Sequence, residues 1–243
     1  LNKKEHDFDF FPYGARSFYK DDKIYVFGGK DWDTEFKTIL MYDTLSCALT
    51  KIGEMLNPRS YHSVNYSNEK KALYIIGGES NATCEQFNFM DNKSSFLPKM
   101  NNTRANCSLF NYKNQYLYAL CGYKDSIISK EINNSFERLD LTGTYYPGKK
   151  ILDFTVGWDK LSLNNSANVE LQFEYVGIMP ITDSHLFLYG GYDKRSLHRS
   201  IVILDLINHK ILPIDDKEVS DLKNGLLEDT KFNEMFDMII SFK

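Results

Sequence analysis

Histidine is the side chain best suited to metal binding and acid–base catalysis near neutral pH, and this chain has five histidines. They stand far apart, and no His-Glu-x-x-His segment or other close ligand spacing occurs. We therefore expect no metal site and no cofactor, and we expect the two histidines in strand-like segments to be ordinary packed residues. The five are His6, His62, His185, His198 and His209, of which His62 and His185 lie in such segments.

Other catalytic motifs are also missing from the sequence. It contains neither a Gly-x-Ser-x-Gly nucleophile elbow nor a Gly-x-x-x-x-Gly-Lys-Ser/Thr phosphate loop. A carboxylate pair for acid–base chemistry stays open, because its two members need to meet only in the folded chain. We expect a protein that is not an enzyme.

Composition narrows the class of protein further. The formal net charge is −4, whereas nucleic-acid-binding proteins carry a basic excess. No apolar run reaches the length of about 18 residues that a membrane helix needs, and the first residues do not form a secretory signal. The four cysteines have irregular spacing, so we expect buried free thiols in a reducing, cytoplasmic compartment, with disulfides as the alternative.

A short sequence motif occurs four times in the chain, and the structural units built on it must position any binding surface of the protein. Each copy is a hydrophobic strand that runs into two small residues, and such self-similarity indicates one structural unit used repeatedly. Adjacent glycines allow positive φ and a sharp turn at the end of the strand. The copies are 23–29, 72–78, 115–122 and 185–191.

Each copy sits within a longer unit of four short strands separated by turn signals, a pattern typical of an all-β repeat. A period of about 40–50 residues with four strands predicts the blades of a β-propeller. We expect one all-β domain over 1–243, with blades at 14–53, 59–100, 104–163 and 173–213 and an insertion near 142–155. Three interpretations stay open for 214–243: a degenerate blade, a strand that closes the ring against Phe8–Phe11, or a terminal helix.

The repeated unit resembles the kelch motif, in which a Gly-Gly pair is followed by Tyr-Asp and by a connector of the form Met-x-x-x-Arg. The first unit carries all of these, and the others carry fewer, with Trp158 as a delayed core tryptophan in the third. The matching residues are Gly28-Gly29, Tyr42-Asp43, Met55 and Arg59; Gly77-Gly78, Phe89, Met100 and Arg104; Cys121-Gly122 and Leu139-Asp140; Gly190-Gly191 and Leu204-Asp205.

The resemblance implies a non-catalytic β-propeller that binds a partner protein, as the substrate-recognition part of a ubiquitin-ligase adaptor or as a cytoskeletal scaffold. It implies that the partner lies on the loops after the glycine pairs and before the first strand of each blade. Some kelch-like propellers are oxidases or sialic-acid enzymes, so the alternative is an enzyme that modifies a sugar or a small molecule. The partner-binding residues implied are Arg16, Trp32, Arg59, Arg104, Tyr123, Tyr192 and Arg195.

The chemistry of these side chains supports binding. Tryptophan, tyrosine and arginine dominate the energetic hot spots of interfaces, and a guanidinium can hold a carboxylate with two parallel hydrogen bonds. Several arginines near one axis would create a local positive potential, so we expect an acidic peptide loop as the partner. Two alternatives remain: Arg59 and Arg104 bond backbone carbonyls of neighbouring blades, or Trp32 folds back onto its own blade.

Overall fold

The structure is a computed structural model that describes residues 12–125, 130–132, 135–142, 157–165, 174–192 and 201–213. Every regular element in these ranges is a β-strand. The strands form four antiparallel sheets of four strands and one short hairpin. The expectation of an all-β chain is therefore confirmed, and closure of the sheets into a ring stays a prediction. The hairpin consists of β11 (Tyr123–Asp125) and β12 (Lys130–Ile132). Along the chain it stands between the second and third strands of the third four-stranded sheet.

Each sheet falls on one of the four repeats recognised in the sequence. In every sheet the strands follow one another in chain order, so that each pairs with its neighbour as a hairpin. Sheet 1 holds β1 (Arg16–Lys20), β2 (Lys23–Phe27), β3 (Thr38–Asp43) and β4 (Ala48–Glu54); sheet 2 holds β5 (Ser63–Ser67), β6 (Ala72–Ile76), β7 (Cys84–Asn88) and β8 (Lys93–Leu97); sheet 3 holds β9 (Ser108–Tyr112), β10 (Tyr116–Leu120), β13 (Phe136–Asp140) and β14 (Trp158–Leu161); sheet 4 holds β15 (Gly177–Pro180), β16 (His185–Tyr189), β17 (Ile201–Asp205) and β18 (Lys210–Pro213).

The small residues after the second strand of each sheet turn the chain as predicted. All eight residues of the four pairs have positive φ, including Cys121 at 58°. At Gly77, with φ +68°, a Cβ atom would lie only 2.2 Å from the carbonyl oxygen of Arg104. The glycine is therefore required by a close approach between two backbone segments, and not by the turn alone.

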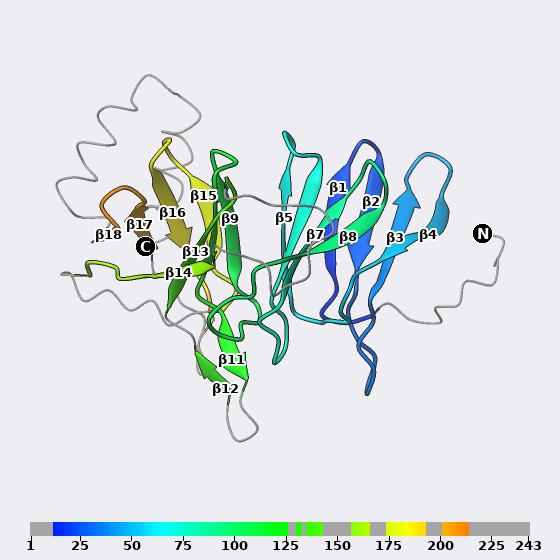
Figure 1. Cartoon of the computed structure of the whole chain (residues 1–243), viewed down its shortest axis with the longest axis horizontal. Coiled ribbons are helices and arrows are strands. Elements are labelled where there is room, and N and C mark those ends of the chain that lie inside the picture. The colour runs from blue at the N-terminus through cyan, green and yellow to red at the C-terminus, as the bar shows by residue number, and fades with distance from the viewer. Residues whose placement is uncertain are drawn as a thin grey trace.

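The core has one layer between each pair of successive sheets, and a further buried cluster, of Phe187, Ile203 and Leu212, lies on sheet 4. Figure 1 shows the sheets following one another in chain order across the molecule. The first strands lie at the contacts between sheets: β1 with β5, β5 with β9, and β9 with β15. Trp158 on β14 packs in the layer between sheets 2 and 3 and donates its indole N–H to the Pro98 carbonyl at 2.8 Å. Its predicted role as a packing residue is confirmed.

Several expectations fall on other parts of the chain. The segment 214–243, Phe8–Phe11, most of the insertion near 142–155, and Arg195 lie outside the described residues. All four cysteines are free, as expected, but Cys47 is exposed where a buried thiol was expected, because it lies in the turn between β3 and β4. Within the described ranges, no helix has the length and apolar character needed to cross a bilayer.

Candidate functional site

The loops after the glycine pairs and the segments before the first strands lie together at one end of the sheets, called here the loop end. It is at the bottom of Figure 1, whereas the tight turns within the hairpins are at the top. In three sheets the residue after the small pair forms a β-bridge with the segment before the first strand. In sheet 2 the Glu79 amide donates to the Ser60 carbonyl at 3.0 Å instead. The bridges are Tyr13 with Lys30, Ala105 with Tyr123, and Glu174 with Tyr192.

Asn106 ties the four sheets together at the loop end. Its side-chain oxygen accepts a hydrogen bond from Arg16 Nη2 at 2.7 Å, and its amide nitrogen donates to Glu174 Oε2 at 3.1 Å. Its backbone N–H donates to the Tyr61 carbonyl at 2.8 Å, and its own carbonyl accepts from the Tyr175 amide at 3.2 Å. These partners lead into sheets 1, 2 and 4, so the first strands of all four sheets converge on this buried residue.

Aromatic side chains on the loop end remain exposed to solvent. Trp32 is 91% exposed, so the alternative in which it folds back onto its own blade is wrong. Tyr192, also predicted as a contact, is 38% exposed. Two further tyrosines with exposed rings, Tyr13 and Tyr175, were missed by the sequence reasoning, although they stand three and two residues before the first strands of sheets 1 and 4. We call Tyr13, Trp32, Tyr175 and Tyr192 the aromatic loop surface.

Lys30, which lies next to this surface, already has an acidic partner. Lys30 forms an ion pair with Glu79, and its ammonium lies over the rings of Tyr13 and Tyr61, at 5.7 and 5.3 Å from their centroids. Burial, the largest single influence, lowers the pKa of Lys30, but the hydrogen bond to Glu79 and the charges of Glu79, Tyr61 and Tyr13 together raise the net pKa. The charge is thus held within the protein and stabilises the loop.

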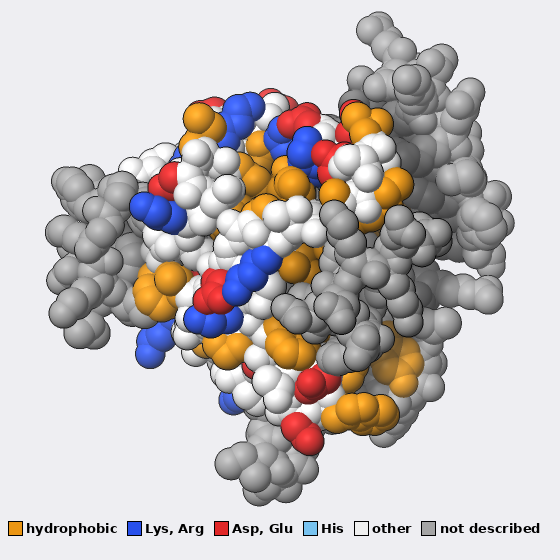
Figure 2. Space-filling view, turned by 90° about the vertical axis from the view of Figure 1, so that its right-hand side faces the viewer, with side chains coloured by type: hydrophobic (Ala, Val, Ile, Leu, Met, Phe, Trp, Pro, Cys, Tyr) orange, Lys and Arg blue, Asp and Glu red, His pale blue; other side chains and the backbone are white. Residues whose placement is uncertain are grey.

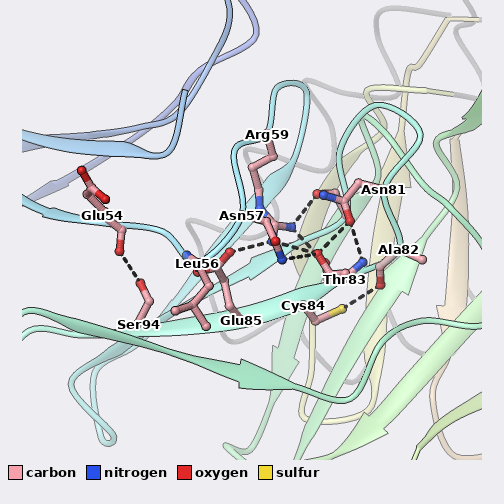
Figure 3. Close-up of polar contacts among 11 residues, drawn as sticks. Glu54, Leu56, Asn57, Arg59, Asn81, Ala82, Thr83, Cys84, Glu85 and Ser94 are labelled. Carbon is pink, nitrogen blue, oxygen red and sulfur yellow. Dashed lines mark hydrogen bonds and ion pairs between the residues drawn. The ribbon is translucent and has the colours of Figure 1, made fainter. Parts of the chain in front are cut away.

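Arg59, predicted to face a partner, is instead completely buried, and this prediction is wrong. Its Nη1 donates to the carbonyls of Gly77 and Thr83, at 2.7 and 2.9 Å, and its Nη2 donates to Glu85 Oε1 at 2.6 Å (Figure 3). The other carboxylate oxygen of Glu85 accepts the Leu56 amide at 2.6 Å. The guanidinium therefore fastens the connector from sheet 1 to the third strand of sheet 2, which confirms the alternative of carbonyl bonding between blades.

Arg104 repeats this arrangement one sheet further on, and it is equally buried. Its Nη1 donates to the carbonyls of Cys121 and Ser135, at 2.6 and 2.8 Å, and its Nη2 donates to Glu137 Oε1 at 2.9 Å. Glu137 Oε2 accepts the Asn101 amide at 2.8 Å. We call the two sets of contacts the arginine–glutamate networks. Both arginines are structural, and sequence reasoning missed Glu85 and Glu137, although each is the second residue of the third strand in its sheet.

The remaining predicted contacts have mixed outcomes. Tyr123 is only 4% exposed, so its prediction as a contact residue is wrong; its pairing with Ala105 carries its ring into the interior. Arg16 is half-buried, and its guanidinium is held by Asn106. The structure thus leaves Trp32 and Tyr192 together on the accessible loop end and withdraws Arg59, Arg104 and Tyr123 from it.

His62 lies just before β5 and is completely buried, next to the positive charges of the loop end. Burial, and then the charges of Arg59 and Arg16, hold its pKa well below the ordinary value of 6.5. Among the described residues, no three His, Cys, Asp or Glu side chains are grouped so that they could hold a metal ion. His62 is therefore a neutral packed side chain in the native state.

The depressed pKa of His62 predicts a loss of stability on acidification. Above pH 6.5 the imidazole is neutral in both states; below it, the unfolded chain binds a proton that the native chain does not, until the folded pKa is reached. We expect His62 to remove about 1 kcal/mol of unfolding free energy per pH unit below about pH 6.5. Urea denaturation between pH 5 and 7 measures this slope. His62→Leu should flatten it by that amount, and an unchanged slope in this variant would contradict the assignment.

Comparison with known proteins shows a partial similarity to an enzyme. No protein-family model matches the chain. A protein from Thlaspi arvense named N-(sulfonatooxy)prop-2-enimidothioate sulfolyase is 31% identical over 100 residues, which cover 35% of this chain and 28% of the relative. The chain thus matches little more than a quarter of the length of that protein, and the activity in its name belongs to the relative alone.

Proposed function

We propose that the chain is a kelch-type β-propeller whose loop end binds a partner protein without catalysis. Two features support the propeller. The hydrophobic core lies in layers between successive sheets, and the first strands contact one another in series. The convergence of segments from all four sheets on Asn106 is the arrangement that blades around an axis require.

The exposure of Trp32 on an ordered loop is the observation that carries the proposed binding. Asp31 fixes this loop, because its side-chain oxygen accepts the backbone amides of Asp33 and Thr34 at 3.1 and 2.7 Å. The Asp31 amide in turn donates to the Thr34 carbonyl at 3.1 Å. A large aromatic ring held in solvent by a fixed turn is a preorganised anchor, which spares binding the entropy of ordering the loop.

We propose that exposed aromatic side chains, and not positive charges, provide the binding energy. The two arginines that favoured an acidic peptide are buried and paired with glutamates. Lys30 is paired as well. We therefore propose a protein partner with an apolar or aromatic pocket for the Trp32 ring, in a cytoplasmic setting such as a ubiquitin-ligase adaptor or a cytoskeletal scaffold.

Trp32→Ala should strongly reduce capture of this partner and leave the fold intact. An anchor of this kind contributes about 2 kcal/mol or more, so we expect affinity to fall by a factor of about 30. Proteins captured from extracts of the source cells by wild type and variant are compared by quantitative mass spectrometry. Leu45→Ala is the matched control, because Leu45 is also a large exposed apolar side chain but lies in the turn between β3 and β4, at the opposite end. Identical capture by both variants would reject the loop end as the binding surface.

A lyase acting on a small molecule is the second candidate function, and the name of the partial relative favours it. The test is incubation of the chain with N-(sulfonatooxy)prop-2-enimidothioate and measurement of released sulfate. Release above the rate without protein, removed by heat denaturation of the chain, would support catalysis. Release at the uncatalysed rate would leave the binding proposal as the better account.

A further inference from the structure

A pocket of about 360 Å³ opens between sheets 1 and 2 at the end opposite to the loop end. It lies where the β1–β2, β5–β6 and β7–β8 turns meet, at the top of Figure 1. Figure 2 shows apolar side chains between basic and acidic ones in the upper part of that view. The volume is within the range of pockets that hold small molecules, about 300–1,000 Å³. Its end of the sheets carries none of the residues of the aromatic loop surface, so it is a separate site.

The walls of the pocket are aromatic and apolar. Tyr25, Tyr66 and Phe89 line it together with Met41 and Ile52. The rings are packed edge to face: the Phe89 centroid is 4.9 Å from that of Tyr25 and 5.7 Å from that of Tyr66. Rings held in this way offer both faces and edges to a planar ligand, and a methionine side chain adapts to its shape.

Three lysines and one aspartate line the pocket, although the chain as a whole carries a net charge of −4. Lys20 is paired with Asp21, and Lys23 Nζ lies 3.8 Å from Asp43. Lys71 instead donates to the neutral side chain of Asn68 at 3.0 Å, and no described carboxylate forms a salt bridge with it. An ammonium has three donors, so Lys71 offers both charge and hydrogen bonds to an anion.

We propose that this pocket binds a small planar aromatic molecule that carries a carboxylate. The ring lies among Tyr25, Tyr66, Phe89 and Met41, where it displaces water from apolar walls. The carboxylate faces the lysines and pairs with Lys71, the cation without an acidic partner among the described residues. This site does not depend on the function proposed for the loop end.

The proposal is tested with 2-naphthoate as the probe and with the neutral 2-naphthamide as its isostere. Methionine methyl groups labelled with carbon-13 report the position of binding, because Met41 and Met90 line the pocket. Met55 is buried at the loop end of the same layer, beside Gly28, and Met100 is buried in the layer between sheets 2 and 3. We expect saturable shifts of the Met41 and Met90 signals and unchanged Met55 and Met100 signals. The naphthamide should bind about tenfold more weakly, since it lacks the charge. Missing shifts, shifts confined to Met55 or Met100, or equal binding of both probes would overturn the proposal.

Two neighbouring lysines provide the matched variants. Lys71→Gln should weaken 2-naphthoate about threefold and leave 2-naphthamide unchanged, whereas Lys70→Gln, next to the pocket but not lining it, should change neither. Tyr66→Phe should change the binding of neither probe, because the ring that lines the pocket is kept and the hydroxyl is closed to solvent. Thermal unfolding of each variant confirms that it is folded. An equal effect of the two lysine substitutions on 2-naphthoate would overturn the assignment of Lys71.

Discussion

Arg59→Met should lower the free energy of unfolding by about 3–5 kcal/mol, the largest effect expected from a single substitution in this chain. The substitution keeps most of the volume and removes the cation, so the completely buried Glu85 carboxylate would face the interior without its partner at 2.6 Å. The carbonyls of Gly77 and Thr83 would lose their donors at the same time. Urea denaturation followed by circular dichroism measures the difference.

Two comparisons separate the loss of the ion pair from the loss of a side chain. Arg59→Met combined with Glu85→Leu should recover most of the stability, because a buried charge pair is often replaced by apolar residues with little loss. Lys51→Met, which breaks the exposed pair with Glu54 at 2.7 Å, should cost less than about 1 kcal/mol. An equal cost for Arg59→Met and Lys51→Met would contradict the structural role of the arginine.

Gly77→Ala should destabilise the protein by about 2–4 kcal/mol, because the new Cβ atom would collide with the Arg104 carbonyl oxygen at 2.2 Å. The backbone conformation is not sufficient to explain this cost. Cys121 occupies the same position of sheet 3 with φ 58°, so a side chain can be accommodated in this conformation. The close approach of the connector to Gly77 therefore makes the difference.

Gly157→Ala is the matched control for this prediction. A Cβ atom at Gly157 would meet no atom of the described residues within 4 Å, so the substitution should change the unfolding free energy by less than about 0.5 kcal/mol. Chemical denaturation of both variants under the same conditions compares them directly. Similar values for the two would show that the connector can move away from Gly77.

The sheets were predictable because their signals are local. Each hydrophobic strand and the two small residues that follow it stand within one short stretch of the sequence. These stretches correctly predicted the positions of all four sheets along the chain. The exposure of Trp32 was predictable for the same reason, since its loop is polar on both sides. Features decided by neighbouring residues were thus within reach of the sequence.

The burial of Arg59 and Arg104 depends on contacts between different sheets. Their partners Glu85 and Glu137 lie 26 and 33 residues further along the chain, and these two separations differ. No fixed spacing therefore links each arginine to its glutamate, and an arginine near a loop looks the same whether it faces solvent or the next sheet. The convergence on Asn106 and the pocket between sheets 1 and 2 were missed for the same reason, since each is made by residues of several repeats.

The arginine–glutamate networks also determine how such a chain can change in length during evolution. Each network joins an arginine that precedes one sheet to a glutamate within that sheet, so the self-contained segment begins at the arginine and ends just before the next one. An in-frame duplication of 59–103 would carry its own arginine, its own glutamate and a junction that the existing connector already fits. A duplication of 84–103 would instead copy Glu85 without an arginine and leave an unpaired ion in the interior.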